Sequence, residues 1–323
     1  MLAYDWIVMI VVAIAAIIVW ELVYTVSSVR LTVGQEFKFY YDINIEESSG
    51  NIYTLFDDED VFSYDVLSIG SESLTTDVDV LTARLSVYEG DVLVTDFAEP
   101  AEDADDKSVR LKTVVDNYSG YSYEQMLKDA KEYLSGFMKD GVTGDINKDT
   151  YNLENLDEQK IEQVFRSRMK KDNRYRKEEQ IKDGVKQEVE RIKKLYLEVV
   201  KFDHLLSKKT TNPELFYCYT RYEQAKASNP DGAYDVVYQR ELDAGRGDNV
   251  YALKLAGLTN FKGEGSNKKD PSEYFKMKGK DDASNVGIMV FNFLDKQPHL
   301  QFEVISFINA IVSECSNIYD TII

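Results

Sequence analysis

The chain of 323 residues has few of the side chains that build most metal and catalytic centres. It contains two cysteines, Cys218 and Cys315, and two histidines, His204 and His299. So few residues argue against a Cys/His zinc site. The two cysteines leave two alternatives open, a disulfide between them or two buried free thiols.

Sequence motifs of common enzymes are also absent. No G-x-S-x-G or H-E-x-x-H motif occurs, and the two histidines offer no plausible catalytic triad. Paired carboxylates support glycoside hydrolysis, but no pair stands out among 57 acidic residues. We therefore predict no catalytic residues, no bound metal and no cofactor, and we interpret the chain as a protein that is not an enzyme.

Basic residues are in deficit, with 38 Lys and Arg against 57 Asp and Glu and a net charge of -19. This balance argues against a nucleic-acid partner, because phosphate binding needs a basic face. Residues 36–110 hold 20 acidic and four basic residues, whereas residues 157–201 hold 14 basic and 10 acidic residues. Two solvated faces are the simplest interpretation. The alternatives are attraction between the two regions, or a basic helix that lies toward an anionic surface.

Tryptophan occurs only in one apolar segment near the N-terminus. No charged or polar residue lies from Trp6 to Trp20, and Tyr4 and Tyr24 flank this run. A helix over residues 4–24 is about 30 Å long, the thickness of a hydrocarbon core. Aromatic rings at both ends are typical of membrane interfaces. We predict a transmembrane anchor through which the chain contacts the lipid bilayer.

Two alternatives for this segment are a cleaved signal peptide and a core helix of a soluble domain. A signal peptide is disfavoured because no basic residue precedes the apolar run and no small-residue cleavage pattern follows it. Only Arg30 and Lys38 lie close behind the segment, so the positive-inside rule gives little guidance on orientation. We expect a single-pass protein of the cell membrane with an extracellular C-terminal domain, since that part is strongly acidic and has no nucleotide motif.

The first part after the anchor has an α/β pattern. Strands are predicted over 34–45, near 61–69 and over 91–97, because β-branched and aromatic residues dominate there. Helical spacing over 75–90, ending at Gly90, places a helix between the second and third strands. This order predicts a βαβ unit with parallel strands.

The next part is predicted to be mainly helical. Ser122 and Gln125 form a capping-box pattern at the start of a helix over 123–138. Another helix begins near Leu156, and an apolar stripe marks a long amphipathic helix that needs a partner surface. The stripe consists of Ile181, Val185, Val189, Ile192, Leu195, Tyr196 and Val199.

The C-terminal part is mixed. Residues 211–285 are rich in turns and contain a strand candidate at 249–258. Residues 286–294 read as a buried strand, and Pro298 opens a final helix. We divide the chain into an anchor and juxtamembrane segment at 1–30, an α/β lobe at 31–120, a helical section at 121–206, a mixed second lobe at 207–285, and a closing strand and helix at 286–323.

One acidic segment starts like a calcium-binding loop. Asp145, Asn147 and Asp149 occupy the first, third and fifth positions of "DINKDTYNLEN". The sixth position is Thr150 where such loops need glycine, and the twelfth is Leu156 where they need a bidentate acid. We favour a turn between two helices, with a calcium site as the alternative.

Three segments carry a resemblance at the level of the fold. The strand "YDVLSIGSESL", the helix "LTARLSVYEG" and the strand "DVLVTDF" follow one another, and the chain closes with "GIMVFNF" and a long helix. This pattern resembles membrane-anchored extracellular proteins of Gram-positive bacteria that are similar to solute-binding proteins of ABC transporters. The resemblance implies an α/β fold with two lobes like a periplasmic binding protein, here with an N-terminal transmembrane helix and a helical insertion.

The same resemblance implies a site between two lobes, lined by the loops that follow the strands. The candidate residues are Ser71, Glu72, Thr95, Asp96, Tyr118 and Tyr121, which would bind by hydrogen bonds and aromatic contact. We expect a solute-binding-like protein that captures a small ligand or peptide at the cell surface, with an ABC transporter or other envelope protein as partner. The alternative is an envelope scaffold protein that docks a protein through the amphipathic helices of 157–201 without a small ligand.

Overall fold

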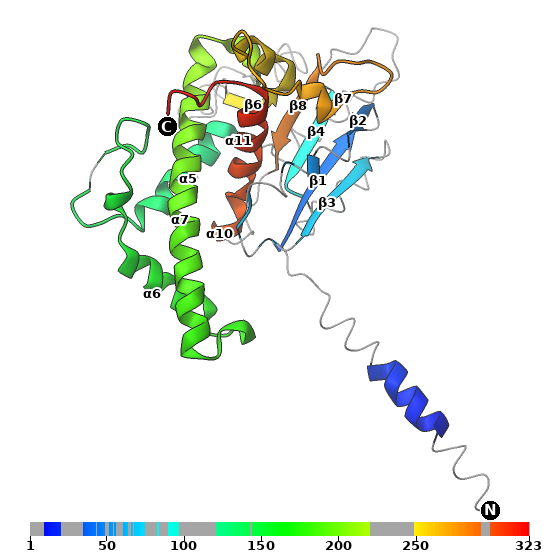
Figure 1. Cartoon of the computed structure of the whole chain (residues 1–323), viewed down its shortest axis with the longest axis vertical. Coiled ribbons are helices and arrows are strands. Elements are labelled where there is room, and N and C mark those ends of the chain that lie inside the picture. The colour runs from blue at the N-terminus through cyan, green and yellow to red at the C-terminus, as the bar shows by residue number, and fades with distance from the viewer. Residues whose placement is uncertain are drawn as a thin grey trace, which may run out of the picture.

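The fold was analysed in a computed structural model (Figure 1). The structure describes residues 10–20, 35–42, 44–48, 52–53, 55, 61–63, 66, 68–74, 83, 90–96, 121–142, 144–219, 249–291 and 298–322. These residues form a mixed α/β body with one continuous hydrophobic core.

A short helix at residues 10–20 precedes the body. Its large apolar side chains are exposed, from 46% for Ile10 to 70% for Trp20. Among the described residues, no helix is both long enough and apolar enough to cross a bilayer. The other aromatic residues assigned to the predicted anchor, Tyr4, Trp6 and Tyr24, lie outside the described residues.

The body contains a six-stranded mixed sheet in the order β3-β1-β4-β8-β6-β5. Both neighbours of β1 run parallel to it, and the remaining pairs are antiparallel. The strands are β1 (Glu36–Asp42), β3 (Ser68–Leu74), β4 (Val92–Asp96), β5 (Phe216–Tyr219), β6 (Asn249–Lys254) and β8 (Val286–Val290). A second, two-stranded sheet pairs β2 (Ile45–Glu47) with β7 (Phe275–Met277).

The expectation of two lobes is wrong for the described residues, because strands assigned to both lobes lie in one sheet. β4 comes from the predicted first lobe, β5 and β6 come from the predicted second, and β8 lies between β4 and β6. All five residues of β8 are buried. A strand that is apolar on both faces is stable only inside a covered sheet, so β8 joins the two halves at the centre.

Several predicted strands are confirmed with small changes in their ends. β1 lies within 34–45, β6 within 249–258, and β8 within 286–294. The strand predicted near 61–69 is displaced, since β3 begins at Ser68. Parallel strands β3, β1 and β4 are consistent with the predicted βαβ unit, but of the helix predicted over 75–90 only Gly90 and Ala83 are described, and Ala83 is helical.

The helices gather beside the sheet (Figure 1). They are α5 (Tyr123–Ser135), α6 (Glu158–Met169), α7 (Glu178–Ser207), α10 (Pro298–Gln301) and α11 (Glu303–Cys315). The helix predicted at 123–138 is confirmed as α5, and the Ser122 side chain accepts a hydrogen bond from the backbone of Gln125 at its start. Pro298 opens α10 as expected.

The long amphipathic helix is α7, and its apolar stripe has its partners inside the chain. α7 contacts α5, α6 and α11. Val189, Ile192 and Leu195 of the stripe are buried in the same core as the sheet. The predicted helical section 121–206 is therefore part of the main body's core.

Aromatic rings connect α11 to the sheet. The ring of Phe307 lies 5.1 Å from that of Phe37 and 6.0 Å from that of Phe39. Cys315, near the end of the same helix, is a buried free thiol, and burial raises its pKa to about 12. The disulfide alternative is therefore not realised, because Cys315 has no partner cysteine.

Candidate functional site

The structure separates the predicted site residues into two groups. Ser71 and Glu72 lie in β3, whereas Thr95 and Asp96 end β4, and β1 runs between these strands. Tyr121 precedes α5, where its backbone N–H donates to the Val290 carbonyl at 2.8 Å and its hydroxyl donates to Asp129. Tyr118 lies outside the described residues.

Neighbouring residues Ser71 and Glu72 have different partners. The Ser71 hydroxyl is 3.0 Å from that of Tyr53, and a Glu72 carboxylate oxygen is 3.5 Å from the Lys38 ammonium nitrogen. Successive side chains of a strand point to opposite faces of the sheet. The side chains of Ser71 and Glu72 therefore lie on opposite faces of β3.

Thr95 belongs to a polar row across the sheet. The register pairs Thr95 with Gly287, and Gly287 with Lys254. Thr95 is 2% exposed, and its buried hydroxyl has no hydrogen-bond partner among the residues that the structure describes. On the other side, Asp42 ends β1 and is 4% exposed. This row lies at the carboxyl ends of β1 and β4, where α/β sheets commonly bind ligands.

Tyr217 of β5 lies near the same row. Burial and the negative charge of Asp96 raise the pKa of Tyr217 to about 12. The Lys254 ammonium nitrogen lies 5.5 Å from the centre of the Tyr217 ring. Asp96 is thus brought close to residues that the sequence did not single out.

A cavity of about 360 Å³ lies elsewhere, between α7, α11 and residues 61–63. Val61, Phe62 and Leu195 supply apolar wall. Arg191 and Glu303 also line it, and both are buried. The cavity therefore combines apolar surface with charged groups from two helices.

Arg191 is fixed by several hydrogen bonds to other residues of the chain. Its guanidinium donates to both carboxylate oxygens of Glu188, to the Tyr133 hydroxyl and to the His299 carbonyl, each at 2.9 Å. Arg168 donates to the same Glu188 carboxylate at 2.9 Å. Burial opposes the charged form of Glu188, but the two arginines outweigh it and lower its pKa to about 2.

Glu303 is also occupied within the chain. One carboxylate oxygen accepts the backbone N–H of Ser63 at 3.0 Å, and the other lies 3.9 Å from Arg191. These contacts fix the segment at residues 61–63 against α11. Arg191 and Glu303 therefore shape the cavity and stabilise its walls.

The two lysines that line the cavity differ from Arg191 and Glu303 in their lack of a described ion-pair partner. Lys186 and Lys194 lie two helical turns apart on α7, on the same side as the exposed Glu190. Neither lysine forms an ion pair with any carboxylate that the structure describes. Two ammonium groups beside apolar wall suit a small molecule that carries both an anionic group and an apolar part.

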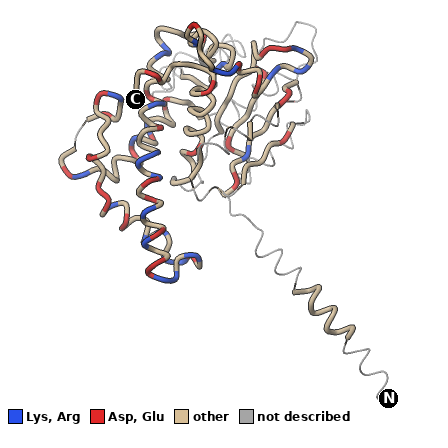
Figure 2. Tube along the Cα trace, viewed as in Figure 1, with Lys and Arg blue, Asp and Glu red and all other residues tan. Residues whose placement is uncertain are grey.

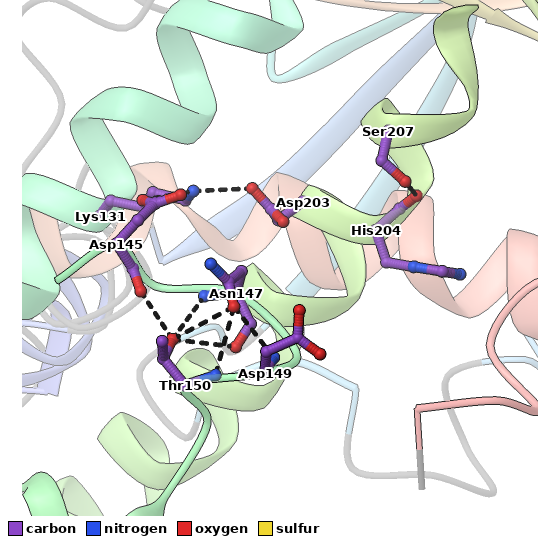
Figure 3. Close-up of polar contacts among 8 residues, drawn as sticks. All are labelled: Lys131, Asp145, Asn147, Asp149, Thr150, Asp203, His204 and Ser207. Carbon is purple, nitrogen blue, oxygen red and sulfur yellow. Dashed lines mark hydrogen bonds and ion pairs between the residues drawn. The ribbon is translucent and has the colours of Figure 1, made fainter. Parts of the chain in front are cut away.

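The calcium-like segment forms a turn closed by its own side chains (Figure 3). Asn147 Oδ1 accepts the backbone N–H groups of Asp149 at 2.9 Å and Thr150 at 3.2 Å. The Thr150 hydroxyl donates to the Asp145 carbonyl at 2.6 Å. These contacts match the helix-linking turn that the sequence favours.

The Asp145 carboxylate of this turn pairs with Lys131 at 2.8 Å, and Lys131 also pairs with Asp203 of α7 at 2.7 Å (Figure 3). Within the described part of the chain, no three His, Cys, Asp or Glu side chains are grouped so that they could hold a metal ion.

Sequence reasoning missed the cavity residues. Lys186, Glu190 and Lys194 recur every four residues beside the apolar stripe, which places them on one helix face. The sequence therefore indicates this helix face, but the opposite wall of the cavity comes from residues 61–63 and from α11. No local pattern indicates this meeting.

Comparisons with known proteins do not extend the resemblance seen in the sequence. No protein-family model matches the chain, and neither curated proteins nor solved structures show a significant similarity to it. The resemblance to solute-binding proteins therefore stays a prediction that rests on short sequence patterns.

Proposed function

We propose that the chain is a membrane-anchored binding protein that holds a small amphiphilic anion in the cavity between α7 and α11. The observation that carries this proposal is the pair Lys186 and Lys194, which line a cavity without carboxylate partners among the described residues. The net charge of the protein is -19, so unpaired lysines are not explained by a general excess of positive charge.

The anchor is the second part of this proposal. The helical residues 10–20 expose a continuous apolar surface, which is unfavourable in water and favourable in lipid. We place the span at residues 4–24 and the body at the outer surface of the cell membrane. A transporter of the ABC class or another envelope protein would then receive the ligand.

The sequence analysis expects a ligand between two lobes, whereas this proposal places the ligand beside a single sheet. The strand-end row around Thr95 and Asp96 is a weaker candidate, since Thr95 is almost fully buried and neither residue lines the cavity between α7 and α11. The scaffold alternative is also weaker, because the apolar faces of α6 and α7 are buried inside the chain. A protein partner would have to use their polar faces.

Melting temperatures of the full chain in nanodiscs test the ligand. The probes are hexyl phosphate, hexanoate, hexanol and hexylamine, which share a tail and differ in charge. We expect only the two anions to raise the melting temperature. Saturation at about 100 times the dissociation constant adds about 2.7 kcal/mol to the free energy of unfolding.

Two double variants sharpen this test. Lys186→Gln with Lys194→Gln should remove the shift, while Lys278→Gln with Lys280→Gln makes the same change of charge outside the cavity and should keep it. A shift of equal size in both double variants, or equal shifts with hexanol and hexyl phosphate, would refute the proposed site. The anchor is tested separately by retention of the chain in membranes after extraction at high pH.

A further inference from the structure

The turn between α6 and α7 carries a concentrated positive charge. Residues 170–177, here called the basic tip, read "KKDNRYRK" and contain five basic residues and one acidic residue. All five basic residues are exposed. They are Lys170, Lys171, Arg174, Arg176 and Lys177.

Most of this charge is not neutralised within the described chain. Asp172 is the acid of the basic tip, and it pairs with Arg174 at 2.9 Å. Arg176 donates to the neutral amide oxygen of Asn173. Lys170, Lys171, Arg176 and Lys177 form no ion pair with any described carboxylate.

Two acids, Glu178 and Glu179, follow the basic tip directly, so residues 170–179 keep a net charge of +2. Glu178 begins α7 and is held by Arg166, with a shortest distance of 2.7 Å. The Arg166 hydrogen bond is the main cause that lowers the pKa of Glu178. Glu178 is therefore already neutralised by a residue outside the basic tip.

The basic tip is packed against α6 and α7 through one aromatic ring. The Tyr175 ring packs edge-on against Phe165 of α6, with ring centres 5.1 Å apart. Gly184 of α7 faces both rings, and a Cβ at this position would come within 2.5 Å of each. The two helices therefore approach closely behind the basic tip, so its cations are presented at little further entropic cost.

The basic tip and the start of the sheet lie toward the same end of the body (Figure 1). α7 runs away from the basic tip for 30 residues, about 45 Å. The first residue of β1 is Glu36, and in Figure 1 the lower ends of the strands lie near α10, short of the lower end of α7. The basic residues of the basic tip are visible there in Figure 2. A chain that leaves a span at Tyr24 can reach about 40 Å before Glu36.

We propose that the basic tip binds the anionic lipid headgroups of the membrane that holds the anchor. This inference rests on the proposed anchor, because only a tethered body meets the same surface continuously. Charge complementarity selects lipid as the occupant. The chain has a net charge of -19 and is repelled overall by an anionic surface, so the local excess of positive charge at the basic tip decides which side approaches that surface. Each basic residue near such a surface raises the equilibrium constant for contact with it about fivefold.

Limited trypsin digestion of the full chain in nanodiscs tests the inference. One set of discs contains phosphatidylcholine alone, and the other adds phosphatidylglycerol. We expect cleavage in the basic tip to be about tenfold slower in the anionic discs, because headgroup contact shields its Lys and Arg. High salt should restore the rate. Cleavage at the exposed Lys278 and Lys280 should be equal in both discs.

A variant removes charge while keeping cleavage sites. Lys170→Gln with Lys171→Gln should lose most of the protection at Arg176 and Lys177, and Lys148→Gln with Lys182→Gln should keep it. Equal cleavage of the basic tip in both discs by an incorporated chain would overturn this inference alone. A chain that does not incorporate into either disc would overturn the proposed anchor and this inference with it, and the ligand cavity would be unaffected.

Discussion

The α6–α7 hairpin carries charged residues in two environments, buried near the core and exposed at the basic tip. Near the core, Arg168 and Arg191 share the carboxylate of Glu188, which is 1% exposed. At the basic tip, Lys170 and Lys171 are exposed and have no described carboxylate partner. The same residue types thus fix the helices in one place and remain available for binding in the other. Predictions that separate these roles follow from the largest effect to the smallest.

Arg191→Met should have the largest effect on stability. It leaves the carboxylates of Glu188 and Glu303 in a buried site without their shared cation. Breaking a buried pair in this way costs about 3–5 kcal/mol of the free energy of unfolding. Urea denaturation measures the loss.

Lys193→Met is the matched control on the same helix. Lys193 pairs with Glu158 and Glu190, both largely exposed, and such pairs contribute about 0–1 kcal/mol. Similar losses in both variants would mean that burial does not distinguish these arginine and lysine contacts.

Gly184→Ala should destabilise the hairpin behind the basic tip. The new methyl group would meet the rings of Phe165 and Tyr175 at 2.5 Å. Overpacking outweighs the better helix propensity of alanine, and we expect a net loss of about 1–2 kcal/mol. Hydrogen exchange across residues 165–184 should accelerate. Gly136→Ala, at a helical backbone conformation where the nearest contact is 3.3 Å, should be close to neutral.

His299→Gln should flatten the dependence of stability on pH. Burial, together with Arg168 and Arg191, lowers the pKa of His299 to about 3. Between about pH 3 and the ordinary value of 6.5, only the unfolded chain protonates this residue, so stability falls as the pH falls through that range. The slope is at most about 1.4 kcal/mol per pH unit.

Chemical denaturation at pH 5, 6 and 7 measures this slope. Burial also lowers the pKa of His204, so His204→Gln should remove a further part in the same direction. The lowered pKa of Glu188 also reduces stability as the pH falls toward 5, but this contribution is common to both chains and cancels in the difference between them. An unchanged slope in His299→Gln would show that His299 is not buried in its neutral form.

Thr95→Val extends the comparison to the sheet, where a buried polar group is not satisfied. Within the described part of the chain the Thr95 hydroxyl has no hydrogen-bond partner, in contrast to the guanidinium of Arg191. Valine has the same shape without the buried hydroxyl, and we expect a gain of about 1 kcal/mol in thermal or urea unfolding. A loss of stability would reveal a hydrogen bond to this hydroxyl.

Local periodicity predicted the elements that depend on nearby residues. The stripe from Val189 to Val199 indicated α7, and the apolar run at 286–294 indicated a buried strand. The cap at Ser122 was also readable, because its partner Gln125 is three residues away. In each of these cases the relevant contacts lie within one or two helical turns, or within one strand.

Contacts between distant segments could not be predicted in the same way. The single sheet of the described residues could not be foreseen, because strand pairing between β4 and β8 leaves no local pattern. The cavity depends on Ser63 meeting Glu303 and on both facing α7, and the sequence separates these residues widely. Of the predicted site residues, only Thr95 and Asp96 lie in the polar row that the register brings together, and neither lines the cavity.

The position of β8 has a consequence for the order of events during synthesis. Val92 of β4 pairs with Val290 of β8, so the middle of the sheet stays incomplete until nearly the whole polypeptide has left the ribosome. The parallel strands β3, β1 and β4 are made first and lack their neighbour β8 until then. Such late, long-range closure slows folding and exposes strand edges. A chaperone that shields the edge of β4 in this interval would raise the yield of folded protein.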